Sequence, residues 1–127
     1  MPDRPSNKEI CKKVADALAA VEAGRRQIAL TKHFADDAYE LGLEGEAALW
    51  ELIPKLLREI QEADPAVCYA GSHPPLKSYE REILGAELWA FHWKSSELAR
   101  EIYLKFVMKK GADDWFYVHC RCHDDRP

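Results

Sequence analysis

Two candidate strands and the turn between them occupy residues 100–123, which read REIYLKFVMKKGADDWFYVHCRCH. Apolar and polar side chains alternate in both runs, and this alternation is typical of β-strands with one buried face. The pattern predicts strands over residues 100–109 and 115–123. The glycine of Lys109-Lys110-Gly111-Ala112-Asp113 predicts a hairpin turn between them. A third strand is predicted over residues 87–93, so we expect an antiparallel sheet in this half of the chain.

Alternation assigns the side chains of these strands to two opposite faces. We expect one face to form the core, with Trp89, Phe91, Trp93, Ile102, Leu104, Phe106, Met108, Phe116, Val118, Cys120 and Cys122. The opposite face, called the outer face below, would carry His92, Tyr103, Lys105, Val107, Trp115, Tyr117, His119, Arg121 and His123.

The N-terminal half has the pattern of helices. Residues 6–9, SNKE, fit a capping box, in which a hydroxyl caps the helix and a carboxylate follows three residues later. Apolar side chains follow at helical spacing, and Gly24 is a natural stop. A second helix is predicted from residue 31 or 32 to 41, and a third from about 44 to 62. Pro54 lies inside the third and predicts a kink or two abutting helices, because proline has no backbone N–H to donate.

Helices precede strands in this chain, and that order predicts an α+β domain. The 127 residues fit a single domain, residues 1–127. We expect a helical half over residues 1–62, a long loop over 63–78 and an antiparallel-sheet half over 79–127. An exposed helix face is expected to carry the carboxylates of Asp36, Asp37 and Glu40.

The composition, 47% hydrophobic and 31% charged, excludes an intrinsically disordered chain. The formal net charge of −4 argues mildly against a nucleic-acid-binding protein. All of that net charge lies in residues 1–70, however, and residues 71–127 are neutral overall. Apolar runs are too short to span a bilayer and the N-terminus lacks a signal-peptide pattern, so we expect a cytoplasmic protein with no membrane partner.

The outer face combines side chains that suit RNA chemistry. Lys105 and Arg121 can neutralise phosphates, and tyrosine and histidine rings can stack on unpaired bases. Histidine also exchanges protons near neutral pH. The face could therefore supply a base, an acid and positive charge for attack of a ribose 2′-OH on the adjacent phosphate. Spacing alone leaves two other interpretations open, a solvated sheet face and a face that binds a partner.

A zinc site is the rival interpretation of residues 119–123, HCRCH, because cysteine and histidine are zinc ligands. In a strand, though, the two cysteines point to one face and the two histidines to the other, so the four cannot converge on one ion. We therefore expect no metal site. Free thiols are expected at Cys11, Cys68, Cys120 and Cys122.

Five short motifs follow one another along the chain, and the similarity described below covers about residues 14–123. They are AYELGL at 38–43, KS at 77–78, LWA at 88–90, EIYLKF at 101–106 and the C-terminal segment 119–127. In this order and spacing they resemble the MqsR-type toxins of bacterial toxin–antitoxin modules. The corresponding elements of that family are an ADELGL helix end, a YKS element, a Trp-Gln pair, a VYLK strand and a last strand with a basic residue. The loop before Lys77 is longer in this chain.

The resemblance implies a RelE-like ribonuclease fold, with helices packed on a twisted antiparallel sheet. It also implies cofactor-free, metal-independent endonucleolytic cleavage of mRNA that a cognate antitoxin neutralises. The family's catalytic lysine, strand tyrosine and last-strand basic residue match Lys77, Tyr103 and Arg121. Two features depart from the family: its glutamine is Ala90 here, with His92 a candidate substitute, and the net charge is negative where these toxins are usually basic.

The leading hypothesis is therefore an mRNA endoribonuclease toxin. Lys77 and Arg121 would stabilise the phosphate and its developing charge, His119 or His123 would act as acid or base, and Tyr103 would orient the scissile phosphate or stack on a base. Further RNA contacts are expected from Lys105, Tyr117 and His92. The alternatives are a non-catalytic protein- or RNA-binding module with a toxin-like fold and a small zinc-binding regulatory protein. The expected partners are mRNA and an antitoxin protein, and a homodimer is left open.

Overall fold

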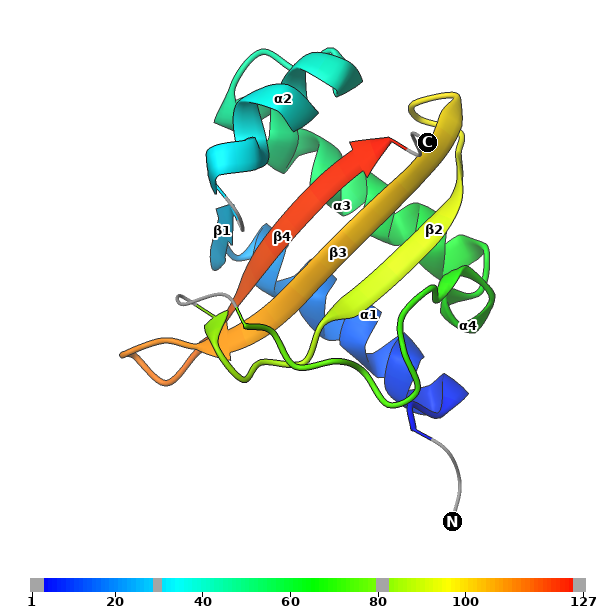
Figure 1. Ribbon diagram of the computed structural model, residues 1–127, viewed down its shortest axis with the longest axis vertical. Helices are drawn as coiled ribbons and strands as arrows, with labels where there is room; N and C mark the ends of the chain where they lie inside the picture. The colour runs from blue at the N-terminus through cyan, green and yellow to red at the C-terminus, as the bar shows by residue number, and fades with distance from the viewer. Residues whose placement is uncertain (1–3, 29–30, 80–82, 125–127) are drawn as a thin grey trace.

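The structure is a computed structural model that describes residues 4–28, 31–79 and 83–124. Its elements are α1 (Asn7–Glu22), β1 (Arg26–Ile28), α2 (Thr31–Leu41), α3 (Glu46–Glu62), α4 (Pro65–Cys68), β2 (Trp89–Ser95), β3 (Arg100–Lys110) and β4 (Phe116–Asp124). The four strands form one sheet in the order β1-β4-β3-β2. In Figure 1, α1 and α3 lie behind this sheet and α2 lies beside its β1–β4 edge.

The α+β class and the three C-terminal strands are confirmed, but the sheet is mixed rather than antiparallel. Strand β1 pairs parallel to β4, with Arg26 opposite Val118 and Ile28 opposite Cys120. Three residues are too few to reveal a two-residue period, so the sequence carries no local signal for this strand.

Residues 65–68 form the short helix α4, where the sequence predicts only loop. The Asp64 side chain accepts a hydrogen bond from the backbone N–H of Ala66, at 3.1 Å, and Pro65 suits the first helical position. One helical turn has too few side chains to show helical spacing, which explains the wrong prediction.

The three longer helices are confirmed, with small shifts at their ends. Ser6 caps α1, because its Oγ accepts a hydrogen bond from the Glu9 N–H at 3.1 Å. Helix α3 is one continuous helix through Pro54, which excludes two abutting helices, while the alternative of a kink stays a prediction. Among the described residues, no helix is long and apolar enough to cross a bilayer.

The core lies between the sheet and the apolar faces of α1 and α3. Phe91 and Phe106 are fully buried on neighbouring strands, and their rings stack with centroids 5.9 Å apart. One assignment to the core is wrong, since Phe116 lies at the end of β4 and is 50% exposed. Val107 lies on the outer face as predicted, but it is fully buried there, next to residues 76–79.

All four cysteines are free thiols, as the sequence predicts. Cys120 and Cys122 lie on the core side of β4 and are buried there. Burial raises the pKa of Cys120 to about 12, so this thiol stays protonated at neutral pH.

Glu59 of α3 joins the helix to the end of β2 and the turn that follows. Its carboxylate accepts hydrogen bonds from Trp93 Nε1 at 3.0 Å, from Ser95 Oγ at 2.7 Å and from the Glu97 N–H at 2.9 Å. Burial alone would raise the pKa of Glu59, but these donors overcome it and the pKa is lowered. Glu59 therefore stabilises the fold at neutral pH, and this contribution is lost as the pH falls through the lowered pKa.

Replacing Glu59 with glutamine should lower the free energy of unfolding at pH 7 by about 2 kcal/mol, because hydrogen bonds to a charged acceptor are lost. Urea unfolding at pH 7 and at acidic pH measures this change. The difference from wild type should shrink on acidification, because wild-type Glu59 then loses its own charge. Glu62→Gln, an exposed carboxylate on the same helix, is the matched control and should stay within about 0.5 kcal/mol of wild type. Equal effects of the two variants would contradict the role assigned to Glu59.

Candidate active site

The sheet register places the predicted site residues of the strands in neighbouring rows across the outer face. The rows are His92–Tyr103–His123, Ala90–Lys105–Arg121 and Val107–His119–Gln27. The alternation in the sequence therefore assigned these side chains to the correct face. Gln27 joins the third row from β1, the strand that the sequence did not predict.

A cavity of about 300 Å³ lies between the outer face and the loop that begins at residue 76. Four of the predicted site residues line it: Lys77, Lys105, His119 and Arg121. Backbone hydrogen bonds hold the loop in place, from the Leu88 N–H to the Leu76 carbonyl at 2.7 Å and from the Ser78 N–H to the Ala86 carbonyl at 2.8 Å. These bonds join residues 76–78 to the residues that lead into β2, and the cavity lining brings Lys77 close to β3 and β4, which begin 23 or more positions later in the sequence.

Arg121 is held by Asp37 of α2. The Arg121 Nε donates to Asp37 Oδ2 at 2.8 Å and its Nη2 to Oδ1 at 3.3 Å, which is a bidentate pair. The Asp37 side chain is only 9% exposed and that of Arg121 26%. The prediction that Asp37 lies on an exposed helix face is therefore wrong, while Asp36 beside it is exposed.

The row His92–Tyr103–His123 is a stack of three rings. The Tyr103 ring centroid lies 4.3 Å from that of His92 and 5.4 Å from that of His123, with interplanar angles of 14° and 20°. Since β2 and β4 lie on opposite sides of β3, the two histidines cover both faces of Tyr103. Each ring face of Tyr103 thus packs against a histidine, so the ring edge and hydroxyl are the parts best placed for contact with a ligand, and base stacking by Tyr103 stays a prediction.

The structure separates the two histidines that the sequence offers as acid or base. His119 is 6% exposed and lines the cavity with Lys105 and Arg121. His123 lies in the stacked row instead. Lys105 stands between the two regions, with its Nζ 5.7 Å from the centroid of Tyr103.

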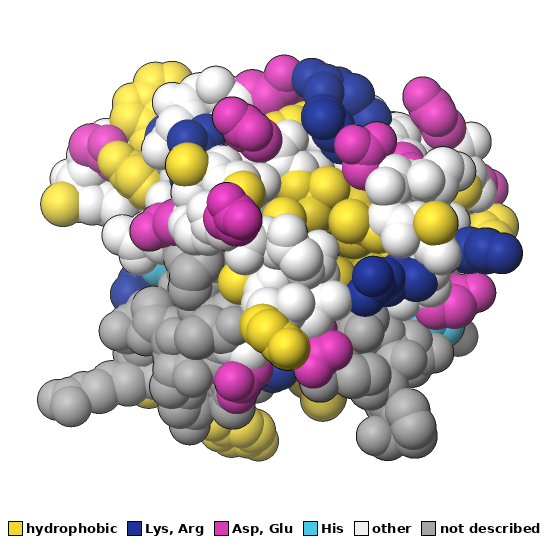
Figure 2. All heavy atoms as spheres, turned by 90° about the horizontal axis from the view of Figure 1, so that it is seen from above, with side chains coloured by type: hydrophobic (Ala, Val, Ile, Leu, Met, Phe, Trp, Pro, Cys, Tyr) yellow, Lys and Arg dark blue, Asp and Glu magenta, His cyan; other side chains and the backbone are white. Residues whose placement is uncertain are grey.

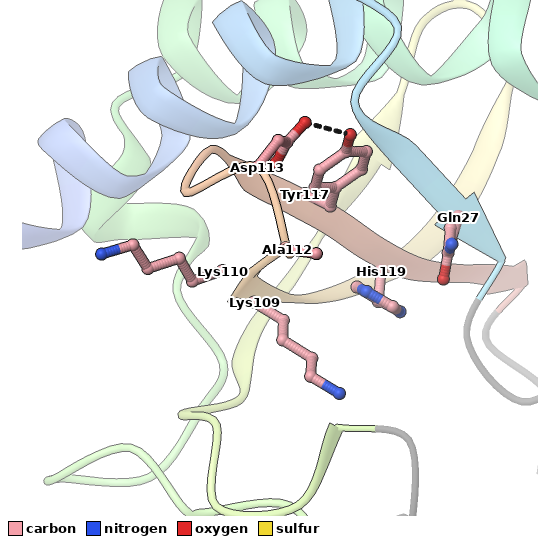
Figure 3. Close-up of a pocket in the computed structure, with 8 residues that line it drawn as sticks. Gln27, Lys109, Lys110, Ala112, Asp113, Tyr117 and His119 are labelled. Atoms are coloured by element: carbon pink, nitrogen blue, oxygen red, sulfur yellow. Dashed lines mark hydrogen bonds between the residues drawn. The ribbon is translucent and has the colours of Figure 1, made fainter.

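Tyr117 is the second residue of β4, and its side chain contacts the turn between β3 and β4. Its hydroxyl donates to Asp113 Oδ2 at 2.7 Å, the bond drawn in Figure 3, and the Trp115 N–H donates to Asp113 Oδ1 at 3.1 Å. The same hydrogen bond raises the pKa of Tyr117 and lowers that of Asp113, because it favours the phenol and the carboxylate. The ring also packs against Gly111, where a Cβ would lie 2.7 Å from Tyr117 Cε1. Tyr117 thus stabilises the turn from β4, and it is also a predicted RNA contact.

No group of three described histidine, cysteine or carboxylate side chains could hold a metal ion. Within the HCRCH segment, Cys120 and Cys122 are buried on the core side, and His119 and His123 lie on the outer face. The residues of this segment do not fit a shared zinc ion, for the geometric reason that the alternation predicts.

The charges around the cavity differ from those of the whole chain. Figure 2 shows acidic and basic side chains interspersed around apolar ones at the end of the molecule that it views. The cavity is lined by the cations of Lys77, Lys105 and Arg121, and the Asp37 carboxylate offsets one of them. The described residues of the lining therefore carry a net positive charge, which favours a phosphate ligand despite the overall charge of −4.

Sequence reasoning missed the site role of Asp37, although a signal was present. Asp37 precedes Leu41 by four residues, so helical spacing places it next to a buried apolar side chain. Gln27 had no comparable signal, because its position follows from the pairing of β1 with a strand far along the chain.

No known protein family matches this chain, and neither a curated protein nor a solved structure is significantly similar to it.

Proposed function

We propose that this protein is a metal-independent endoribonuclease that cleaves mRNA. The proposed site is the cavity between residues 76–79 and the outer face of β3 and β4. The observation that carries the proposal is the convergence of two lysines, an arginine and a histidine on one cavity from three separate segments. These groups can supply positive charge and one of the two proton transfers that phosphodiester cleavage by a ribose 2′-OH requires.

In the proposed reaction the phosphate stays on the 3′-oxygen of one ribose. It is transferred from the 5′-oxygen of the next nucleotide to the 2′-oxygen of that first ribose. A base removes the 2′-OH proton, the new P–O bond closes a 2′,3′-cyclic phosphate, and an acid protonates the departing 5′-oxygen. Lys77, Lys105 and Arg121 stabilise the negative charge that develops on the phosphate oxygens. His119 supplies one of the two proton transfers, and Tyr103 orients the phosphate through its hydroxyl.

The proposal includes a RelE-like fold and the biological role of a toxin that a cognate antitoxin neutralises. Its support is the resemblance of the five motifs to MqsR-type toxins, together with the arrangement of helices on one face of a sheet. Lys77, Tyr103 and Arg121, which match the family's catalytic positions, lie on or beside one side of the sheet. Position 90 is alanine in this chain, and it lies in the same row as Lys105 and Arg121.

Purified protein should cleave a long unstructured RNA in the presence of EDTA, and Lys77→Ala should lower the rate roughly 100-fold, because one charge that faces the phosphate is removed. Lys77 is exposed, so the variant should keep the wild-type melting temperature. Lys8→Ala, an exposed lysine on α1, is the matched control and should cleave like wild type. Cleavage that disappears in EDTA would contradict the metal-independent mechanism, and equal rates for the two variants would contradict the site.

A second candidate function is a non-catalytic binding module with the same fold. The bidentate pairing of Arg121 with Asp37 favours it, because the pair offsets the charge of a proposed catalytic group. Induced expression in bacterial cells distinguishes the two: the toxin arrests growth and Lys77→Ala relieves the arrest, whereas the binding module leaves growth unchanged.

A further inference from the structure

We propose that a second cavity, at the turn between β3 and β4, is an RNA subsite that binds the substrate beyond the scissile phosphate. Its volume is about 620 Å³, and Figure 3 shows the side chains that line it. This inference rests on the proposed ribonuclease function and specifies its substrate as single-stranded RNA that extends along β3.

The two cavities are adjacent because His119 lines both of them. On β3, Lys105 belongs to the first cavity and Lys109 to the second. These lysines share the outer face, since Lys105 pairs with Arg121 and Lys109 with Tyr117 on the neighbouring strand. Four residues of a strand span about 13 Å, which is longer than one nucleotide of an extended RNA chain. A single-stranded RNA that places one phosphate at Lys105 can therefore place a later one at Lys109.

Lys109 and its neighbour Lys110 are not equivalent in this cavity. Figure 3 shows Lys109 and His119 projecting to the same side of the strands, while Lys110 points away from them. Lys110 also lies 3.7 Å from the carboxylate of Asp114, with which it forms an ion pair. Because the Lys109 side chain projects to the same side as His119, we assign Lys109 as the phosphate-binding cation of the subsite, and Lys110 offers a matched control.

The remaining side chains of the lining are suited to bind an RNA base, and they do not add a second cation for phosphate. The side-chain amide of Gln27, opposite His119 on β1, can both donate to and accept from the edge of an unpaired base. Of the described lining residues Asp113 is the acidic one, and both of its oxygens already accept hydrogen bonds, from Tyr117 and Trp115. Because base edges are reached this way only in unpaired nucleotides, the subsite selects single-stranded over double-stranded RNA.

The test compares cleavage of a dinucleotide with cleavage of RNAs extended by one to three nucleotides at either end. For wild type, kcat/KM should rise about tenfold when the chain becomes long enough to reach Lys109. In Lys109→Ala the ratio of kcat/KM for long over short RNA should fall to near 1, while Lys110→Ala keeps the wild-type ratio. Lys109 is exposed on its strand, so its truncation leaves the packing of the core intact.

Binding of an RNA with a 2′-deoxy nucleotide at the scissile position provides a readout without cleavage. Lys109→Ala should reduce the slope of log affinity against log salt by about 0.7, because one phosphate contact is lost. If both wild type and Lys109→Ala cleave RNA with the same ratio of kcat/KM for long over short RNA, the subsite is overturned and the enzyme proposal stands. Length-dependent binding that needs Lys109, without cleavage of any RNA, overturns the enzyme and retains the subsite. Absence of both binding and cleavage overturns both proposals.

Discussion

If the protein cleaves RNA as proposed, replacement of His119 by glutamine should slow cleavage by about 10²- to 10⁴-fold, the range for loss of a general acid or base. Of the two histidines that the sequence offered, His119 is the one that lines the cavity with Lys105 and Arg121. Glutamine is polar and close in size, so it can occupy the buried position without an apolar mismatch. The rate should be measured as kcat/KM across a range of pH, where the variant should lose one limb of the wild-type profile.

His123→Gln is the matched control for this experiment. It changes the same residue type on the same face of β4, but in the row stacked with Tyr103. We expect a loss of less than about tenfold, because His123 packs beside a proposed site residue and is not assigned a proton transfer. A larger loss for His123 than for His119 would reverse the assignment of roles. Thermal melts of both variants separate a loss of chemistry from a loss of folding.

Replacement of Asp37 by alanine should lower the free energy of unfolding by about 3 kcal/mol, because it leaves the largely buried guanidinium of Arg121 without its partner. In urea this corresponds to a shift of the unfolding midpoint by roughly 1–2 M. Cleavage should fall as well, since Arg121 then lacks the bidentate contact that fixes its orientation.

Two further variants show whether this loss belongs to the ion pair. Asp36→Ala removes the exposed neighbouring carboxylate and should change stability by less than about 0.5 kcal/mol. The double variant Asp37→Leu with Arg121→Met replaces both charges by apolar groups, and its stability should return to within about 1 kcal/mol of wild type. If Asp37→Ala is as mild as Asp36→Ala, the pair behaves as a solvated surface pair and our description of the site fails.

Local patterns predicted the helices and strands that are long enough to contain several repeats of their period. Strands β2 to β4 each show several alternations, and the Ser6 cap follows from a hydroxyl three residues before a carboxylate. Strand β1 and helix α4 are too short for any period. Val107 was assigned to the correct face but to the wrong environment, because burial by a distant loop is a tertiary effect that alternation does not encode.

For the candidate site too, the local pattern predicted which face of the sheet a side chain occupies but not which distant segments lie against it. Alternation placed Lys105, His119 and Arg121 on one face, and the structure adds that they line one cavity. Only the resemblance pointed to Lys77, since nothing in its local sequence shows where its loop packs. The covering of Tyr103 by His92 and His123 depends on the strand register, which a hydrophobic pattern specifies only in part.

The parallel pairing of β1 with β4 has a consequence for the order of folding. The hairpin of β3 and β4 joins residues that are close along the chain, whereas Arg26 and Val118 are about ninety positions apart, and such distant pairing forms slowly. Strand β1 should therefore dock late, with φ-values near 0 for its residues and higher values in the hairpin. In the native state its amides should exchange with deuterium before those at the centre of β3. Gln27 would then join the outer face only in the last step, so an intermediate with an ordered hairpin would already hold Lys105, His119 and Arg121 without it.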